Sequence, residues 1–134
     1  TSAGAALQSK YMLTGDERKY PEYDGDFPTI EANNIIIDKG LGLLPNAIID
    51  QHFIQRSRMN RLLTAVLEHP GLLGIGIDES TAILVQDGTA KVYGKAQVIT
   101  LRNPNGKPRV ANGYLGATGI ELNIYLPGDT FAVR

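Results

Sequence analysis

Ser2 stands in the tetrapeptide Thr1-Ser2-Ala3-Gly4, which matches the last four positions of the nucleophile-elbow pattern G-x-S-x-G. In that elbow, a sharp turn between a strand and a helix exposes the serine hydroxyl and aims the next N–H at the oxyanion. A serine at the N-cap of an ordinary helix would give the same residues. On the tetrapeptide alone, the helix cap is the favoured interpretation.

A serine nucleophile needs a base within hydrogen-bond reach, and that base needs an acid that fixes its tautomer. The chain has two histidines. His52 follows a short apolar segment and two polar residues, which favours a site. His69 precedes Pro70 at the expected end of a helix, where a cation suits the helix dipole. We therefore interpret His69 as structural and His52 as the candidate base.

Two acids, Asp78 and Glu79, come directly after the apolar segment 72–77. Polar residues that follow buried strands collect at the edge where open α/β sheets place their sites. The pair could therefore orient His52, or it could only cap the following turn.

Three arginines follow His52, at Arg56, Arg58 and Arg61. A guanidinium cluster beside a catalytic histidine favours recognition of a substrate carboxylate. The alternative is a solvated helix face, which commonly carries such charges.

Metal and nucleotide chemistry find no support in the sequence. No set of histidines and carboxylates has metal-ligand spacing, so we predict no metal site and no cofactor. Gly74-Ile75-Gly76 is not followed by a helix with a third glycine, which argues against a nucleotide-binding loop.

Apolar runs and turn residues predict how these side chains are positioned. A helix is compatible with residues 2–13, and residues 14–28 are expected to form a polar surface excursion. A second helix is expected around residues 59–67, ended by Pro70 and Gly71. Strands are expected at residues 35–37, 47–49, 72–77, 83–85, 90–93, 98–101, 120–126 and 131–133, with a hairpin turn at Asp87-Gly88 and a loop at 103–119. Buried strands alternating with a helix predict a parallel α/β layer followed by an antiparallel extension.

The composition excludes several classes of function. The 134 residues are 43% hydrophobic and 20% charged, which is ordinary for a globular core. The net charge of −1 gives no reason to expect nucleic acid or an anionic membrane as a partner. Zero cysteines exclude disulfides. No apolar run reaches membrane-spanning length and no signal peptide is found, which favours the cytoplasm; a signal further upstream would instead allow secretion.

Four segments together resemble the cyanophycinases, a family of serine peptidases related to aspartyl dipeptidase. They are TSAGAA at residues 1–6, GLGLLPNAIIDQHFIQRSRMNRL at 40–62, GIGIDESTA at 74–82 and LPGDTFAVR at 126–134. The similarity covers almost the whole chain, and its D-Q-H-F-x-x-R-x-R-x-x-R string is highly specific. The resemblance implies part of a helix-flanked parallel sheet, like that of class I glutamine amidotransferases, with an antiparallel C-terminal extension.

The resemblance also implies roles for individual residues. Ser2 would be the nucleophile, His52 the general base and Glu79 the acid that orients the histidine. The Ala3 N–H would be one oxyanion donor. Polar residues of the arginine string would line the substrate site, namely Asp50, Gln51, Arg56, Arg58 and Arg61.

The implied substrate is cyanophycin, a poly-aspartate backbone with arginine attached through β-carboxyl isopeptide bonds. Family members release β-Asp-Arg dipeptides, and the resemblance leads us to expect hydrolysis of a β-aspartyl linkage through an acyl-enzyme. An acid such as Asp50 suits the guanidinium of this substrate, and an arginine suits its aspartyl carboxylate. An Asp-X dipeptidase of the same fold and a degenerate member that binds without cleaving are the alternatives.

The family pattern places two glycines before Thr1, so we expect this chain to be the C-terminal portion of a single peptidase domain. The expected partner is an N-terminal chain of the same precursor, in a heterodimer that could dimerise further. Self-cleavage, nicking during preparation and a division of the sequence into two chains would each give this start. Self-cleavage would leave a free amine on Thr1, which would make Thr1 an alternative nucleophile, as in a self-processed N-terminal-nucleophile isoaspartyl peptidase. The excursion at 14–28 is longer than the family leads us to expect.

Overall fold

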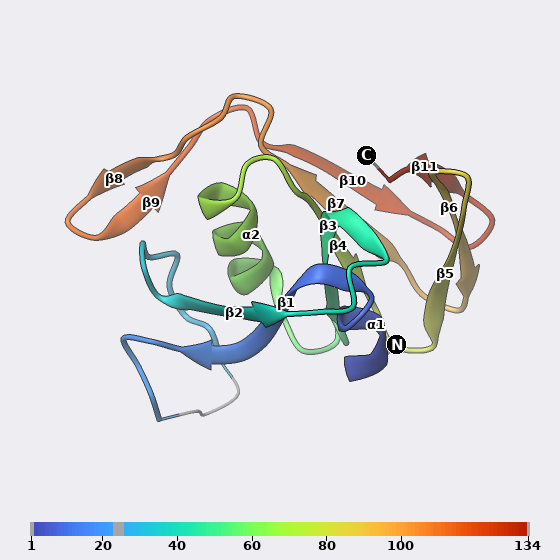
Figure 1. Cartoon of the computed structure of the whole chain (residues 1–134), viewed down its shortest axis with the longest axis horizontal. Helices are drawn as coiled ribbons and strands as arrows, with labels where there is room; N and C mark the ends of the chain where they lie inside the picture. The colour runs from blue at the N-terminus through green and yellow to red at the C-terminus, as the bar shows by residue number, and fades with distance from the viewer. Residues whose placement is uncertain (1, 23–25, 134) are drawn as a thin grey trace.

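The central element of the fold is a six-stranded sheet with the strand order β10-β7-β4-β3-β1-β2. The structure is a computed structural model and describes residues 2–22 and 26–133. The middle strands β1, β3 and β4 run parallel, whereas β2, β7 and β10 each pair antiparallel to their neighbours (Figure 1). The six strands are β1 (Ser9–Glu17), β2 (Ile35–Lys39), β3 (Leu44–Gln51), β4 (Leu73–Ile77), β7 (Val98–Arg102) and β10 (Glu121–Tyr125).

This topology confirms the predicted fold class. Parallel strands form the middle of an α/β layer, and the C-terminal strands β7 and β10 extend it in antiparallel fashion. The two parallel pairs share strand β3, so β3 is flanked on both sides and reads as a buried run from Ala47 to Asp50.

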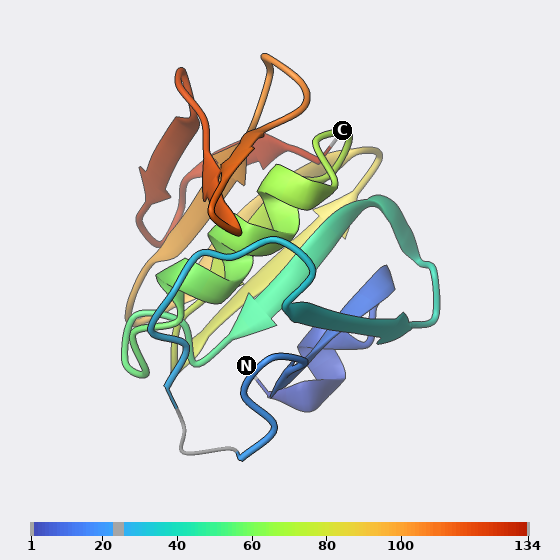
Figure 2. The ribbon, with the colours of Figure 1, turned by 90° about the vertical axis from the view of Figure 1, so that its left-hand side faces the viewer.

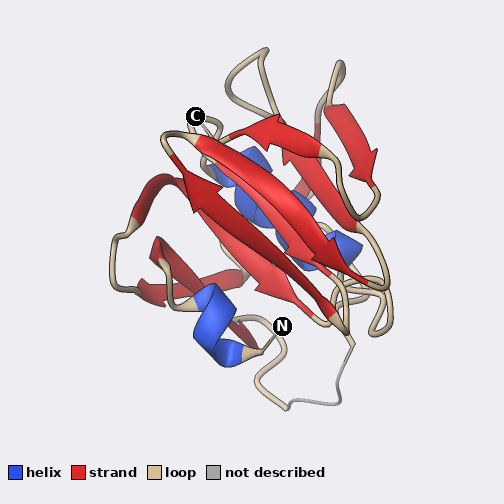
Figure 3. Ribbon diagram, turned by 90° about the vertical axis from the view of Figure 1, so that its right-hand side faces the viewer, coloured by secondary structure: helices blue, strands red, loops and turns tan. Residues whose placement is uncertain are grey.

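Helix α2 (Met59–Glu68) covers one face of the sheet, in front of the strands in Figure 2 and behind them in Figure 3. Leu62, Ala65 and Val66 are fully buried against this face. Two glycines of β4 allow the close approach. A Cβ on Gly74 would lie 2.6 Å from a Val66 methyl, and a Cβ on Gly76 would lie 2.3 Å from the Phe53 ring. The Gly-x-Gly segment therefore serves packing.

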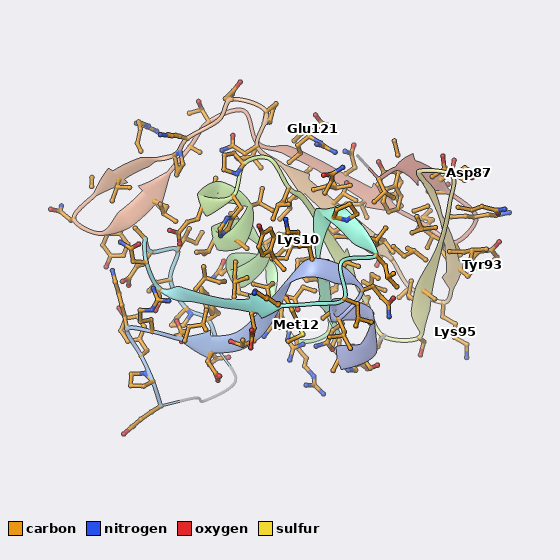
Figure 4. All side chains as sticks on the ribbon, in the orientation of Figure 1. Lys10, Met12, Asp87, Tyr93, Lys95 and Glu121 are labelled. Carbon is orange, nitrogen blue, oxygen red and sulfur yellow. The ribbon has the colours of Figure 1, made fainter. Side chains whose placement is uncertain are left out.

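The opposite face carries helix α1 (Ala3–Ala6) and a small three-stranded sheet with the order β11-β6-β5. Its strands are β5 (Thr81–Gln86), β6 (Thr89–Gly94) and β11 (Thr130–Ala132). A second core lies between the two sheets, where Ile49, Ile75 and Val98 meet Val92 and Phe131. The β5–β6 hairpin turns at Asp87 and Gly88, which both have positive φ, as predicted (Figure 4).

The first predicted helix is wrong beyond its first turn. Helix α1 ends at Ala6, and residues 9–17 form β1, which pairs with β3 through Tyr11 and Ile48. The apolar spacing of residues 3–12 fits a helix, but it also fits a strand whose Ser9 and Leu13 are buried. Pairing with two neighbouring strands decides between these local options.

Two other segments differ from expectation. The predicted loop at 103–119 contains a short hairpin, β8 (Arg109–Ala111) and β9 (Tyr114–Gly116), which turns at Asn112 and Gly113. Both turn residues have positive φ, so the Asn-Gly dipeptide was the overlooked signal. The excursion at 14–28 is partly core, because Phe27 is buried and β1 continues to Glu17.

The polar part of that excursion is held by Glu31. Tyr20 Oη donates a hydrogen bond to Glu31 Oε1 at 2.6 Å, and Lys19 Nζ lies 3.2 Å from Glu31 Oε2. The Tyr20 hydrogen bond lowers the pKa of the Glu31 carboxyl below its usual value. Within the described ranges, no helix is long and apolar enough to span a membrane.

The glycine at position 76 yields a stability prediction. We expect Gly76→Ala to lower the free energy of unfolding by about 1–3 kcal/mol, because the Phe53 ring is buried and cannot move into solvent. Urea denaturation of the whole protein that carries this chain measures the change. Gly71→Ala is the matched control, since its Cβ would meet no atom within 4 Å. Equal destabilisation of both variants would contradict the packing argument.

Candidate active site

The candidate site lies where two adjacent parallel strands end. Strand β3 ends at Gln51 and β4 ends at Ile77, and these two residues are partners in the register. His52 therefore follows one strand at the level where Asp78 and Glu79 follow the other. The predicted gathering of polar residues at this edge of the sheet is confirmed.

His52 and Glu79 are joined by a side-chain contact. His52 Nδ1 lies 2.9 Å from Glu79 Oε1. An ionised carboxylate only accepts hydrogen bonds, so an ionised Glu79 places the ring proton on Nδ1 and makes Nε2 the basic nitrogen. The two side chains are 25% and 42% exposed, so this contact is open to solvent within the described residues. This contact has the geometry that an orienting acid and a base would need beside a serine nucleophile.

The backbone at His52 has an unusual conformation. Its φ is +48°, in the left-handed region that few non-glycine residues occupy. The chain then makes a tight turn, in which the Arg56 N–H donates to His52 O at 3.0 Å. Strained backbone of this kind persists only where the surroundings fix it, and it is concentrated at functional sites.

The two acids after β4 have different contacts. Glu79 meets the imidazole, whereas Asp78 Oδ1 accepts the backbone N–H groups of Ile54 and Gln55 at 3.1 and 2.9 Å. The sequence left open whether this pair orients the histidine or caps a turn. In the structure Asp78 accepts N–H groups of the turn, and Glu79 contacts the imidazole.

Ser2 lies immediately before helix α1, and its carbonyl accepts the Ala5 N–H at 2.9 Å. Its side chain is exposed and makes no capping hydrogen bond with the helix, which argues against the simple cap. Ala3 opens the helix, where N–H groups have no acceptor within the helix. The contact of Ser2 with His52 stays a prediction, and Thr1 lies outside the described residues.

A cavity of about 550 Å³ lies between helix α1, which follows Ser2, and strands β3 and β4. Gly4 and Ala5 of α1 line one side, and Ile77 and Thr81 line another, flanking the two acids in sequence. The cavity is mainly apolar, with Ile49 of β3 in its wall.

Asp50 and Arg61, both predicted to bind substrate, pair with each other. Arg61 Nε donates to Asp50 Oδ2 at 2.6 Å and Arg61 Nη2 donates to Oδ1 at 2.5 Å. Asp50 is 1% exposed and Arg61 is 7% exposed. This two-pronged buried ion pair ties α2 to the end of β3.

The other candidates of the arginine string lie in different surroundings. Arg58 is buried and its Nη1 donates to Gln51 O at 2.8 Å. Gln51 Oε1 is buried and accepts no hydrogen bond within the part of the chain that the structure describes. Arg56 is exposed, in the turn that begins at His52.

His69, interpreted as structural, lies at the end of α2 and stacks on Tyr11, with ring centroids 6.1 Å apart. Only His52 is thus brought to the carboxyl ends of β3 and β4.

Comparison with known proteins assigns the family. The model of Peptidase family S51 matches residues 1–93. The chain belongs to this family.

Three relatives of this S51 chain are cyanophycinases. The cyanophycinase of Trichormus variabilis is 41% identical over 138 residues, covering 98% of this chain and 43% of the relative. That of Synechococcus elongatus is 34% identical over 144 residues, covering 100% of this chain and 41% of the relative. That of Geminocystis herdmanii is 44% identical over 101 residues, covering 73% and 34%. The chain therefore spans less than half the length of the relatives it matches.

The buried pair in this S51 chain yields a second prediction. We expect Asp50→Ala to lower the free energy of unfolding by about 3–5 kcal/mol, because it leaves the Arg61 charge buried without its partner. Asp16→Ala removes an exposed carboxylate from β1 and serves as the control. Thermal and urea denaturation of the whole protein measure both. A loss no larger than that of the control would show that the pair is not a structural brace.

Proposed function

We propose that the protein carrying this chain is a serine-type peptidase that degrades cyanophycin, with Ser2 as nucleophile. The observation that carries the proposal is the His52–Glu79 contact at the ends of adjacent parallel strands, in a chain whose relatives are cyanophycinases. The product is a β-Asp-Arg dipeptide, in which the isopeptide bond is intact. The bond to be cleaved is therefore the backbone peptide bond between successive aspartates, because cleavage of the expected β-aspartyl linkage would release free arginine instead.

The proposed chemistry has two halves. Ser2 Oγ attacks the backbone α-carbonyl carbon of an aspartyl residue while His52 Nε2 takes its proton, and Glu79 accepts the hydrogen bond of the imidazolium Nδ1–H. The Ala3 N–H donates to the oxyanion. His52 then returns the proton to the leaving amine, which leaves an acyl group on Ser2. In the second half, His52 deprotonates a water that attacks this ester, and the proton passes to Ser2 Oγ as the ester bond breaks.

Burial separates the substrate-binding candidates into residues that contact the protein itself and residues that are available to a substrate. Asp50 and Arg61 hold each other, and Arg58 holds the carbonyl of Gln51. Arg56 is the exposed arginine of the string, beside the candidate base. We assign to Arg56 the contact with the aspartyl carboxylate, and to Gln51 Oε1 a hydrogen bond from a donor group of the substrate.

The relatives are more than twice as long as this chain, which supports a partner segment. In the proposed enzyme, residues beyond this chain supply the strand that leads to Ser2 and a second oxyanion donor. The cavity beside α1 is a place where such a segment can pack, since its walls are mainly apolar. The same arrangement would serve a precursor cut before Thr1.

The nucleophile assignment yields a third prediction. We expect Ser2→Ala in the whole protein to lower kcat for cyanophycin on the order of 10⁴–10⁶-fold, since the acyl group can no longer form. Release of β-Asp-Arg, followed by mass spectrometry, measures the rate.

Thr1→Ala is the discriminating companion variant. It retains activity if Ser2 is the nucleophile. Full activity of Ser2→Ala together with an inactive Thr1→Ala would replace Ser2 with the terminal threonine. Assays on β-Asp dipeptides beside the polymer distinguish a cyanophycinase from an Asp-X dipeptidase.

The assignment of Arg56 yields a fourth prediction. Loss of one charge-assisted hydrogen bond costs about 1.5–3 kcal/mol, so we expect Arg56→Gln to raise KM roughly 10–100-fold with a smaller effect on kcat. Lys107→Gln, an exposed cation in the loop after β7, is the control. An unchanged KM for Arg56→Gln would refute the substrate contact.

A further inference from the structure

We infer that Asp78 is a positioning residue for the proposed base: its carboxylate fixes the turn that carries His52, so that the imidazole stays against Glu79. This inference rests on the proposed function for its effect on catalysis. It goes beyond that function because Asp78 meets the backbone of the turn and is not among the residues assigned to the reaction.

The contacts come from a single carboxylate oxygen. Asp78 Oδ1 accepts the N–H of Ile54 at 3.1 Å and the N–H of Gln55 at 2.9 Å. Asp78 is only 7% exposed, so water replaces these two acceptor contacts poorly. Its own backbone is fixed in turn, because its N–H donates to Gln97 O at 3.2 Å.

The turn needs such an acceptor. Phe53, Ile54 and Gln55 present three successive N–H groups toward the end of β4, like the first turn of a helix. The Phe53 N–H donates to Ile77 O at 3.3 Å, and Asp78 takes the other two. A carboxylate in this place acts as an N-cap supplied from a neighbouring strand.

The effect reaches His52 through the backbone. His52 has a left-handed φ of +48° and immediately precedes the capped N–H groups, so relaxation of the turn would release this strained conformation. The Phe53 ring packs against Gly76 and fixes the start of the turn, whereas Asp78 binds the next two N–H groups. Asp78 thus holds the backbone of the turn, and the adjacent Glu79 holds the ring of its first residue.

The position of the turn, set by Asp78, therefore affects the tautomer of His52, set by Glu79. Both follow β4, so a shift of the turn relative to β4 changes the distance between His52 Nδ1 and Glu79 Oε1. A displacement of about 1 Å in a catalytic group can cost on the order of 100-fold in rate.

The test compares Asp78→Ala with Asp78→Asn in the whole protein. The alanine removes the acceptor, whereas the asparagine keeps a carbonyl oxygen that can accept both N–H groups. We expect Asp78→Ala to lower kcat roughly 100-fold with little change in KM, and Asp78→Asn to recover most of this loss. NMR of the His52 imidazole should show loss of the hydrogen-bonded Nδ1–H signal in Asp78→Ala and its return in Asp78→Asn.

Glu121→Ala is the control for removal of a carboxylate. Glu121 lies on β10 and is the register partner of Arg102, at the last residue of β7 (Figure 4). Asp78 follows Ile77, whose register partner is Val98, at the other end of β7. Glu121→Ala should leave kcat and the His52 signal unchanged.

Three outcomes would overturn the inference. One is an unchanged Nδ1–H signal in Asp78→Ala. Another is a variant that is only less stable, with normal kcat well below its melting temperature. If Asp78→Ala does not fold, Asp78→Asn decides, because loss of the signal in that variant shows that the acceptor does not do the positioning. Failure of the proposed function looks different: Ser2→Ala would stay active while the His52 signal still follows Asp78.

Discussion

The contact between His52 Nδ1 and Glu79 Oε1 depends on the parallel pairing of β3 and β4. Gln51 and Ile77 are partners in the register, so the residue after one strand and the second residue after the other come within reach. A slip of one residue would turn each side chain to the other face of the sheet. The pair would then be lost, whatever the local sequence around either residue.

That register is held by packing on the two faces of β4. Ile75 and Ile77 point into the core shared with the small sheet, while Gly74 and Gly76 leave room for α2 and Phe53 on the other face. The large side chains of β4 thus face the small sheet, and β4 has only glycines on the side of the helix. The arrangement fits only one way round, because a side chain at either glycine would collide with buried groups. The packing of the core therefore also fixes the position of the His52 turn relative to the end of β4.

Much of this arrangement could be predicted from the sequence. The helix from Met59 has strong local periodicity, the run from Ile35 to Ile37 is β-branched, and the hairpin at Asp87 has turn residues suited to positive φ. Strand ends followed by polar residues then indicate one edge of a sheet as the site.

What the sequence did not predict depends on contacts between distant segments. Residues 9–13 satisfy both a helical and a strand pattern, and only their pairing with β2 and β3 decides. Likewise, nothing local distinguishes Asp78 from Glu79, since both are acids after the same strand. Their different contacts arise because the turn after β3 presents N–H groups to one of them and an imidazole to the other.

The arginine string illustrates how a specific motif can combine scaffold and chemistry. Arg61 closes a buried ion pair with Asp50, and Arg58 binds the carbonyl of Gln51, so both brace the end of β3 from the side of α2. Asp50 directly precedes the two residues that lead from the strand into the turn, and a buried carboxylate there needs a fixed cation. This bracing accounts for the places of Arg58 and Arg61 in the string, whatever role the two arginines have toward a substrate. Arg56 has no comparable structural contact to explain its place among the described residues, and it lies exposed in the turn that begins at His52.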